Sequence, residues 1–315
     1  MIKCHRINTK DEKMNLKQLR NTLLLVLAAF VWGTTFVAQS IGAEKIGTFT
    51  FLAARSYIAA TALIPVVLVY GKVNPYRPKN EEERINGRRL LIRGGIICGL
   101  FFFAGSSLQQ AGIAYTTTAK ASFITTLYVI IVPLFGLLVG KKVGGKIWFC
   151  VALGVLGLYL LCMSEKLSLQ KGDALVLLCA VLFSGHILVI DRFSPQTDGV
   201  RLSCIQFFTA AVIGTICMLI FEKPSWDSIM EAMPSLLYAG IFSGAIGFTL
   251  QIIAQQDLNP TVASLAMCLE SVFGALAGWV VLGQTLTSRE LIGCTLMFAA
   301  IVIAQLPIGK HNESV

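Results

Sequence analysis

The chain is poor in charge. Only 14% of its 315 residues are Asp, Glu, Lys or Arg, whereas 55% are hydrophobic. A soluble domain carries about 25% charged residues, so this sequence has too few of them to cover a folded surface in water. The shortage excludes disordered, fibrous and ordinary cytosolic proteins. Together with a mean hydropathy of +0.73, it indicates a polytopic membrane protein.

Residue patterns typical of enzymes and metal sites are also scarce. The nine cysteines are scattered without Cys-x-x-Cys or other metal-ligand spacing, and no acidic cluster offers a two-metal site. Ser184 and His186 cannot share a proton, because side chains so close along a helix point apart. The segment 140–146 has the spacing of a phosphate loop, but Ile147 stands where that loop needs a magnesium-binding Ser or Thr. The sequence therefore predicts no enzyme, no cofactor and no metal.

What the sequence does contain is a series of long apolar runs. A membrane-spanning helix needs about 20 mainly apolar residues. The runs are continuous and lack the alternation of an outer-membrane β-strand. Away from the span ends, only Arg55 and Glu270 interrupt them with charge. The predicted spans are 22–42, 48–70, 94–115, 119–140, 146–164, 173–191, 202–221, 234–255, 260–283 and 290–308. The predicted fold is an all-α polytopic membrane protein with ten transmembrane helices.

The loops set the orientation. With ten spans both termini lie on one side, and that side carries 19 Lys and Arg residues against six on the other. The positive-inside rule therefore places both termini in the cytoplasm. The formal charge of +9 is assigned to loops beside anionic lipid, not to a nucleic-acid surface. The first span is predicted to be retained, because its apolar run is about twice the length of the one in a signal peptide.

The chain also contains an internal repeat. Shifting the sequence by 142 places residues 108–139 on 250–281, with eight of 32 positions identical, among them Gln109 on Gln251. Nearer the N-terminus the best shift is 151, and the longer charged loop 71–93 in the first half accounts for the difference. The chain therefore reads as two halves of five spans each.

These halves define the predicted domain organisation. An odd number of spans per half forces the second half to enter the membrane upside down. Inverted repeats of this kind are the architecture of secondary transporters, with the site near the midplane between them. The predicted segments are a cytoplasmic tail 1–20, a first repeat 21–164, a link 165–171, a second repeat 172–308 and a cytoplasmic tail 309–315.

Two charged residues in the spans are the first candidates for a site. Glu270 lies about ten residues into the ninth span, near the bilayer centre at ~1.5 Å per residue. A central acid costs about 2.5–3.5 kcal/mol on insertion scales, so it is expected to face a cavity. A protonated carboxyl joining two helices is the alternative. Arg55 either faces the same cavity or extends to the headgroups, and the sequence does not show whether it meets Glu270.

Uncharged polar residues complete the candidate site. Tyr128 occupies the repeat position of Glu270 and is expected at the same depth. Taken singly, a polar residue of this kind is more often a contact between helices than a binding group. The other residues assigned to substrate binding are Trp32, Gln109, Ser122, Thr125 and Gln251, and Thr35, Gln39, Gln110 and Gln255 are further candidates.

Several segments resemble one transporter family. The first span contains Trp32-Gly33-Thr34-Thr35-Phe36, and the second Phe51-Leu52-Ala53-Ala54-Arg55. The ninth contains Leu269-Glu270-Ser271-Val272-Phe273 and ends in Leu282-Gly283-Gln284. The chain resembles bacterial members of the drug/metabolite transporter superfamily, of the kind with two EamA domains, over nearly all of residues 21–308.

This resemblance implies alternating access between the inverted repeats and, most often, export of amino acids or related metabolites. Two residues depart from the family pattern. Ser271 stands where the family usually has Pro, and Gln284 replaces an acid, which argues against ion coupling by a carboxylate at that end.

The resulting hypothesis is a secondary active transporter in the bacterial plasma (inner) membrane. It would export a small polar metabolite, with membrane lipid and a coupling proton as further partners. Glu270 would bind a substrate ammonium or exchange the proton, and Arg55 would attract a substrate carboxylate. A non-saturating channel and a structural or sensory membrane protein are the alternatives. Substrate, direction, coupling ion and oligomeric state, including a homodimer, stay open.

Overall fold

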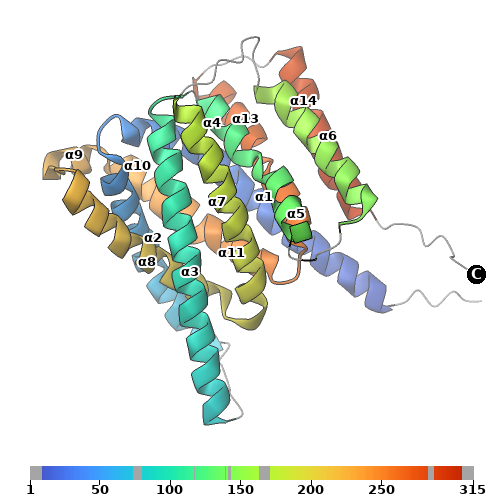
Figure 1. Ribbon diagram of the computed structural model, residues 1–315, viewed down its shortest axis with the longest axis horizontal. Helices are drawn as coiled ribbons and strands as arrows, with labels where there is room; N and C mark the ends of the chain where they lie inside the picture. The colour runs from blue at the N-terminus through green and yellow to red at the C-terminus, as the bar shows by residue number, and fades with distance from the viewer. Residues whose placement is uncertain are drawn as a thin grey trace, which may run out of the picture.

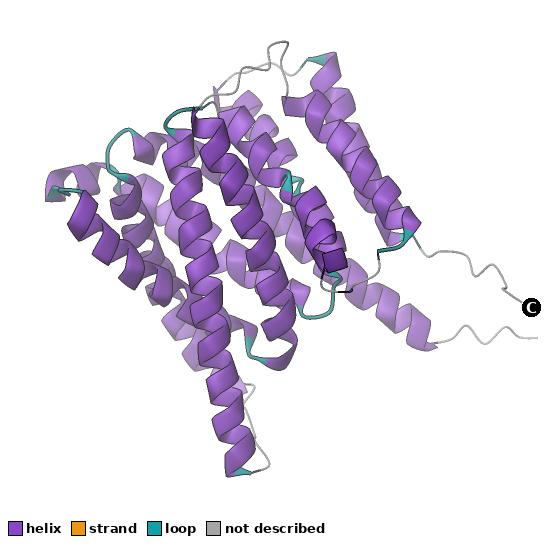
Figure 2. Ribbon diagram, in the orientation of Figure 1, coloured by secondary structure: helices purple, strands orange, loops and turns teal. Residues whose placement is uncertain are grey.

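The fold is described from a computed structural model that covers residues 9–73, 80–116, 118–138, 140, 143–162, 171–282 and 287–306. Within these ranges the secondary structure is helical, with no strand (Figure 2). Apart from Lys171, the predicted link 165–171 lies outside the described residues, as do the C-terminal tail and Gln284.

The helices follow one another with short connections. Their bounds are α1 (Thr9–Ala43), α2 (Thr48–Val73), α3 (Glu81–Ile113), α4 (Thr118–Thr126), α5 (Tyr128–Leu138), α6 (Gly145–Cys162), α7 (Lys171–Phe193), the 3₁₀ turn η1 (Ser194–Gln196), α8 (Gly199–Phe221), α9 (Trp226–Glu231), α10 (Met233–Leu237), the π-helix η2 (Tyr238–Phe248), α11 (Thr249–Gln255), α12 (Pro260–Met267), α13 (Glu270–Leu282) and α14 (Ser288–Gln305).

The predicted all-α polytopic fold is confirmed. Eight stretches of the described helices are long and apolar enough to cross a membrane, and α6 provides a shorter apolar helix. With α14, these helices are the counterparts of the ten predicted spans. Three spans are composite: α4 with α5, then α10 with η2 and α11, and finally α12 with α13.

Two helices extend well beyond their predicted spans. α1 begins at Thr9 and α3 at Glu81, each 13 residues before the expected boundary. The prediction followed apolar runs, whereas a helix continues into water wherever its end is capped. At α3 the Asn80 side chain accepts a hydrogen bond from the Glu83 backbone N–H. Three Glu residues in the first turn complement the positive end of the helix dipole. α3 therefore projects from the bundle (Figure 1).

The helices pack in pairs that obey a pseudo-two-fold axis. α3 packs on α7, and its counterpart, η2 with α11, packs on α1. In the same way α13 packs on α1, while α4 and α5 pack on α7. α2 packs on α8, and α6 on α14, so these two pairs lie on the axis itself. The two inverted five-helix repeats are thus interlocked, because each major contact joins one half to the other.

The α6–α14 pair shows how closely two of these helices approach. A Cβ on Gly157 would lie 2.6 Å from the Gly293 carbonyl oxygen, and one on Gly293 would lie 2.5 Å from the Gly157 carbonyl oxygen. Any side chain at either position would force the backbones apart. Small residues at such crossings give van der Waals contact, which holds helices together in lipid where the hydrophobic effect does not.

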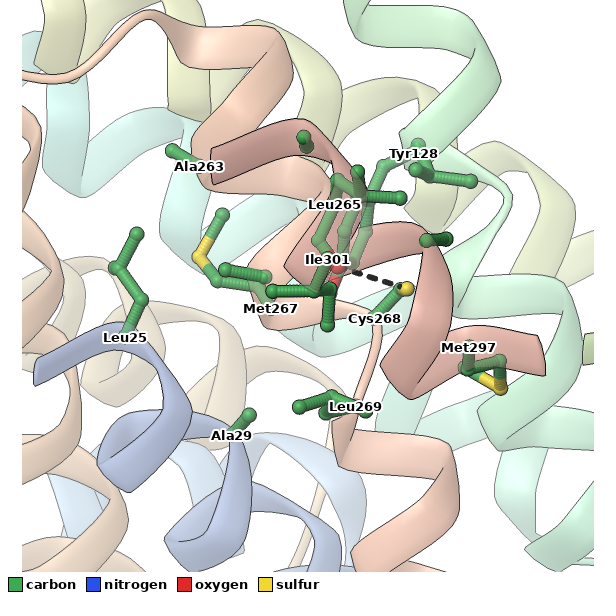
Figure 3. Close-up of a cluster of buried hydrophobic side chains, with 14 of the residues drawn as sticks. Leu25, Ala29, Tyr128, Ala263, Leu265, Met267, Cys268, Leu269, Met297 and Ile301 are labelled. Carbon is green, nitrogen blue, oxygen red and sulfur yellow. Dashed lines mark hydrogen bonds between the residues drawn. The ribbon is translucent and has the colours of Figure 1, made fainter. Parts of the chain in front are cut away.

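The largest buried apolar cluster surrounds the composite ninth span. Leu265, Met267 and Leu269 of this span pack with Leu25 of α1 and Ile301 of α14 (Figure 3). All five side chains are almost completely buried. This cluster fixes the ninth span against both repeats, and so determines where Glu270 lies.

Candidate functional site

A polar cavity lies between the two repeats. The empty space within its walls, part of which is continuous with the surroundings, is about 540 Å³, and about 50 Å³ is open to the centres of water molecules. Since one water needs about 10–15 Å³ on that measure, the cavity has room for a few waters and no more. It is lined by Trp32, Thr35, Phe36, Gln39, Arg55, Ser106, Gln109, Thr125, Tyr128, Phe183, His186, Ile187, Ser243, Phe248, Gln251, Met267 and Glu270.

The lining follows the repeat. At the shift of 142, Gln109 pairs with Gln251 and Tyr128 with Glu270, and both members of each pair line the cavity. At the shift of 151, the same holds for the equivalent positions on α1 and α7. These pairs are Trp32 with Phe183, Thr35 with His186 and Phe36 with Ile187. The shift of 142 also pairs Ser106 with Phe248 and Thr125 with Met267. The cavity therefore lies on the pseudo-two-fold axis, and its two sides carry different chemistry.

Both repeats break a helix at the edge of this cavity. α4 gives way to α5 at Leu127, and α12 to α13 at Cys268 and Leu269. In the second break the Cys268 thiol donates to the Leu265 carbonyl oxygen at 2.9 Å, which satisfies an acceptor inside the break (Figure 3). Tyr128 and Glu270 are the first residues after the breaks. Discontinuous helices of this kind form the substrate and ion sites of many transporters.

Glu270 lies in this break as an unpaired acid. Its exposed fraction is 5%, and its Oε1 has no hydrogen-bond partner among the described residues. Because it opens α13, it stands at the positive end of that helix dipole, which favours a carboxylate there. Ser106 Oγ, Tyr128 Oη and Gln251 Oε1 are likewise buried without a partner. Buried polar groups are normally hydrogen-bonded, so four open groups around one cavity indicate a place for a ligand.

Arg55 lies on the aromatic side of the cavity. Its exposed fraction is 5%, so the side chain does not extend to the headgroups. Its Cζ lies 5.9 Å from the Phe51 ring centroid and 5.4 Å from that of Phe102, both within cation–π range. Among the described residues no ion pair joins Arg55 to Glu270, although both line the cavity. The cavity thus contains an acidic and a basic side chain that do not pair with each other directly.

An amide network forms another part of the wall. Gln39 Nε2 donates to the Oε1 atoms of Gln109 and Gln110, at 3.2 Å in both cases. Gln109 Nε2 in turn donates to Thr125 Oγ1 at 3.2 Å, and Gln110 Nε2 to the Gln39 carbonyl oxygen at 3.1 Å. The network ties α1, α3 and α4 together, so it holds Gln109 and Thr125 in fixed orientations at the cavity surface.

Trp32 closes the cavity against the π-helix η2. Its Nε1 donates to the Ser243 carbonyl oxygen at 3.3 Å, and its ring lies 4.7 Å from that of Phe248. A Cβ on Gly247 would lie 2.6 Å from Trp32 Nε1, so only glycine leaves room for the indole. π-helical turns occur frequently at functional sites, because the wider coil displaces backbone groups from their usual direction.

His186 is a cavity residue that sequence reasoning missed. Its Nε2 lies 2.8 Å from Gln206 Oε1, and its ring packs edge-on against Phe183 and Phe248. The sequence presented this histidine only as a neighbour of Ser184. The shift of 151, which places His186 on Thr35, is the feature that could have identified it.

Comparison with known proteins agrees with this architecture. The model of the EamA-like transporter family matches the chain twice, over residues 20–163 and 170–305. The chain belongs to the EamA-like transporter family. It is a multi-pass membrane transporter by that membership.

Relatives of this EamA-like transporter cover almost its whole length. An uncharacterized transporter of Archaeoglobus fulgidus is 27% identical over 293 residues, covering 93% of this chain and 88% of its own. The inner membrane transporter YedA of Escherichia coli K12 is 24% identical over 306 residues, covering 95% and 94%. A solved crystal structure superposes with a TM-score of 0.72 at 18% identity, covering 90% of this chain and 96% of its own, and shows the same fold.

Seven of the eight predicted binding residues line the cavity, and Ser122 does not. Its Oγ lies 2.7 Å from Ser271 Oγ, and Thr126 Oγ1 lies 3.2 Å from the same atom. Ser271 is the residue that departs from the family's usual Pro. In this EamA-like transporter its hydroxyl therefore joins the fourth span to the ninth, directly beside the two helix breaks.

We expect the Ser122–Ser271 hydrogen bond to be structural. In a double-mutant cycle of Ser122→Ala and Ser271→Ala, the coupling free energy should be about 0.6 kcal/mol, the average for such bonds between membrane helices. Thermal unfolding of the four proteins in detergent measures it. Transport should persist in Ser122→Ala, and its abolition would instead place Ser122 in the substrate path.

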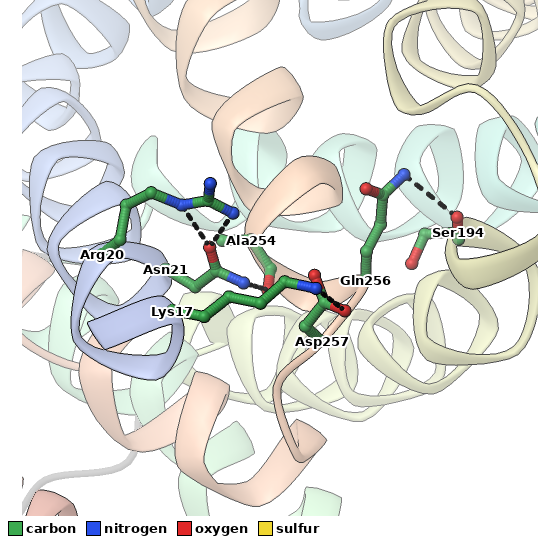
Figure 4. Close-up of polar contacts among 7 residues, drawn as sticks. All are labelled: Lys17, Arg20, Asn21, Ser194, Ala254, Gln256 and Asp257. Carbon is green, nitrogen blue, oxygen red and sulfur yellow. Dashed lines mark hydrogen bonds and ion pairs between the residues drawn. The ribbon is translucent and has the colours of Figure 1, made fainter. Parts of the chain in front are cut away.

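Polar contacts link the two halves of the bundle on both sides of the cavity. On the side where α1 begins, Lys17 Nζ donates to Asp257 Oδ1 at 2.8 Å, and Asn21 Nδ2 to the Ala254 carbonyl oxygen at 3.2 Å (Figure 4). On the side where α7 begins, Thr116 Oγ1 donates to Asp173 Oδ1 at 2.5 Å. The Asn21 and Thr116 contacts join one repeat to the other, so polar contacts link the repeats on both sides of the cavity.

Proposed function

We propose that this protein is a secondary active transporter that exports a small zwitterionic metabolite, such as an amino acid or a related compound, across the bacterial plasma membrane. One observation carries the proposal. A cavity on the pseudo-two-fold axis contains one carboxyl group, that of Glu270, and one guanidinium, that of Arg55, and the two do not pair with each other within the described structure. Two separate opposite charges match a solute that carries both an ammonium and a carboxylate.

Glu270 and Arg55 would fix the two ends of the solute. A carboxylate beside open acceptors binds an ammonium with charge-assisted hydrogen bonds, and the fork of a guanidinium binds a carboxylate with two parallel ones. In the empty carrier, Glu270 would exchange a coupling proton in place of the ammonium. Burial strengthens both interactions, because few waters compete for these groups.

The uncharged lining would select the solute. Gln109, Thr125 and Gln251 offer amide and hydroxyl groups, and Tyr128 places its hydroxyl at the repeat position of Glu270. Trp32 and the phenylalanines Phe36, Phe183 and Phe248 form apolar parts of the wall and would limit the size of the solute. A space for a few waters suits a small solute, and a larger one would require the walls to separate.

Alternating access would come from opening one end while the other stays closed. With both termini in the cytoplasm, the Lys17–Asp257 and Asn21–Ala254 contacts form the inner gate, and Thr116–Asp173 belongs to the outer one. The two halves 21–164 and 172–308 would exchange conformations, as inverted repeats allow. Lys17 and Asp257 are partly exposed, so their ion pair contributes about 1 kcal/mol or less and opens easily.

Comparison of extracellular metabolites with and without the gene tests this function. We expect one class of zwitterionic metabolite to accumulate outside cells that carry the gene. Proteoliposomes containing the purified protein should then exchange that compound with saturation and counterflow. Flux that rises linearly with concentration would indicate the channel alternative, and no difference in any metabolite would contradict export.

Accessibility of the cavity gives a second, substrate-free test. A cysteine introduced as Tyr128→Cys should react with a small thiol reagent from either side of the membrane, because alternating access exposes the cavity to each side in turn. The native cysteines are first replaced by Ala to leave a silent background. A cysteine that never reacts would support the structural or sensory alternative.

A further inference from the structure

A second binding site can be located on the surface, away from the cavity. The part of α3 that projects from the bundle and the connection from α7 to α8 form the two walls of an open groove, with about 980 Å³ of empty space. Arg84 and Arg88 line it from α3, and Arg201 from the first turns of α8. Three guanidinium groups from segments far apart in sequence therefore face one space.

Two of these arginines keep much of their charge available. Arg88 is exposed and has no ion pair or hydrogen bond within the described structure. Arg201 Nε lies 3.5 Å from Asp198 Oδ2, but the other Asp198 oxygen caps α8 by accepting from the Val200 and Arg201 backbone N–H groups. Arg84 is bound to Glu81 within α3. The groove lining consequently has a net positive charge, with three arginines against the single acid Asp198.

The depth of the groove indicates its ligand. The predicted spans begin at residues 94 and 202, so Arg201 stands at the hydrocarbon edge and Arg88 about 9 Å below it along the helix. Phospholipid phosphates lie between these two levels, within reach of both side chains, since headgroups add about 5–8 Å to each side of the hydrocarbon core. Leu91, also in the groove wall, lies between these two levels and offers apolar contact to the start of an acyl chain.

We propose that the groove binds the headgroup phosphate of an anionic phospholipid, with Arg88 and Arg201 as its ligands. Arginine forks match phosphate oxygens with paired hydrogen bonds, and basic pockets beside membrane helices bind anionic headgroups. The bound lipid would hold α3 against the α7–α8 connection at the membrane surface. This site does not depend on the proposed transport function.

The test measures lipid binding to the purified full-length protein in detergent. Dioleoyl-phosphatidylglycerol should raise the midpoint of thermal unfolding, and native mass spectrometry should show it retained in preference to phosphatidylcholine. Removal of both arginines in R88Q/R201Q should weaken phosphatidylglycerol binding about 30-fold, as expected for two arginines at a membrane surface. R88K/R201K keeps the charge and should retain most of the binding.

A control variant separates this site from general charge. K171Q/K223Q removes two exposed cations from the opposite side of the bundle, and should bind the lipid as the unmodified protein does. An equal loss of phosphatidylglycerol binding in R88Q/R201Q and K171Q/K223Q would overturn the site, because it would indicate general electrostatic attraction between the protein and the lipid. Equal stabilisation by inorganic phosphate would show that a free anion is the ligand. Equal retention of phosphatidylcholine and phosphatidylglycerol by the unmodified protein would also refute the proposal.

Discussion

The variant Glu270→Gln should lose transport by at least about 30-fold while remaining folded. Loss of one partner from a buried, hydrogen-bonded charge pair costs about 2–5 kcal/mol. The neutral amide neither binds an ammonium as an ion pair nor exchanges a proton. Its thermal stability should equal or exceed that of the unmodified protein, because an amide is less costly to bury than a carboxylate with an open oxygen. Proteoliposome exchange and thermal unfolding measure the two effects.

A matched control is available in Glu231, an exposed acid of α9 that pairs with Lys45 at 3.5 Å. Glu231→Gln removes the same charge far from the cavity, so its transport rate should stay unchanged. Exchange at the normal rate in Glu270→Gln would refute the assigned role. Loss of both transport and stability would show instead that the carboxyl is a structural link between helices.

The variant Gly33→Ala should destabilise the fold by about 3 kcal/mol, the range of an overpacked core. Gly33 lies where α1 meets the start of α13. A Cβ there would lie 2.4 Å from the Glu270 carbonyl oxygen and 2.6 Å from the Gly274 backbone nitrogen. Neither backbone atom can rotate away, so α13 must shift and carry Glu270 with it. The midpoint of thermal unfolding should fall by about 5–10 °C, and transport should fall too.

The same contact supplies its own control. A Cβ on Gly274 would lie 3.5 Å from the Gly33 carbonyl oxygen, an ordinary contact distance. Gly274→Ala should therefore leave stability and transport near normal, although both glycines face the same helix pair. An equal loss of stability in the two variants would show that the close approach at Gly33 does not decide the outcome.

Most of the architecture could be predicted because lipid imposes simple rules. Each span must be an apolar run of a certain length, so ten runs predicted ten helices. The extensions of α1 and α3 were missed, since outside the membrane a helix ends by local capping that hydropathy does not detect. The π-helix η2 and the breaks before Tyr128 and Glu270 were not predicted either, because tertiary packing decides them. The domain boundaries stay predictions.

The candidate site could be predicted in part, through the repeat. The shift of 142 identified Tyr128 and Gln251 from Glu270 and Gln109, since equivalent positions converge on the axis. Depth alone could not place the Arg55 side chain, because a long side chain near the end of a span can point either into the cavity or toward the lipid headgroups. Ser122 shows the limit of this reasoning: its hydroxyl meets Ser271 and does not line the cavity, and a one-dimensional pattern does not reveal this direction. Their roles in binding stay proposals.

The interlocking of the repeats constrains how the protein is made. α2, α3 and α6 find their most extensive partners in α8, α7 and α14, all of which are synthesised later. During translation the first five helices therefore enter the bilayer before most of their packing surfaces exist. Gly157 of α6 is synthesised before its partner Gly293 of α14. Glu270 follows on the ninth span, after most of the helices that surround it. Compaction of this chain is thus a late event, after insertion of the second half.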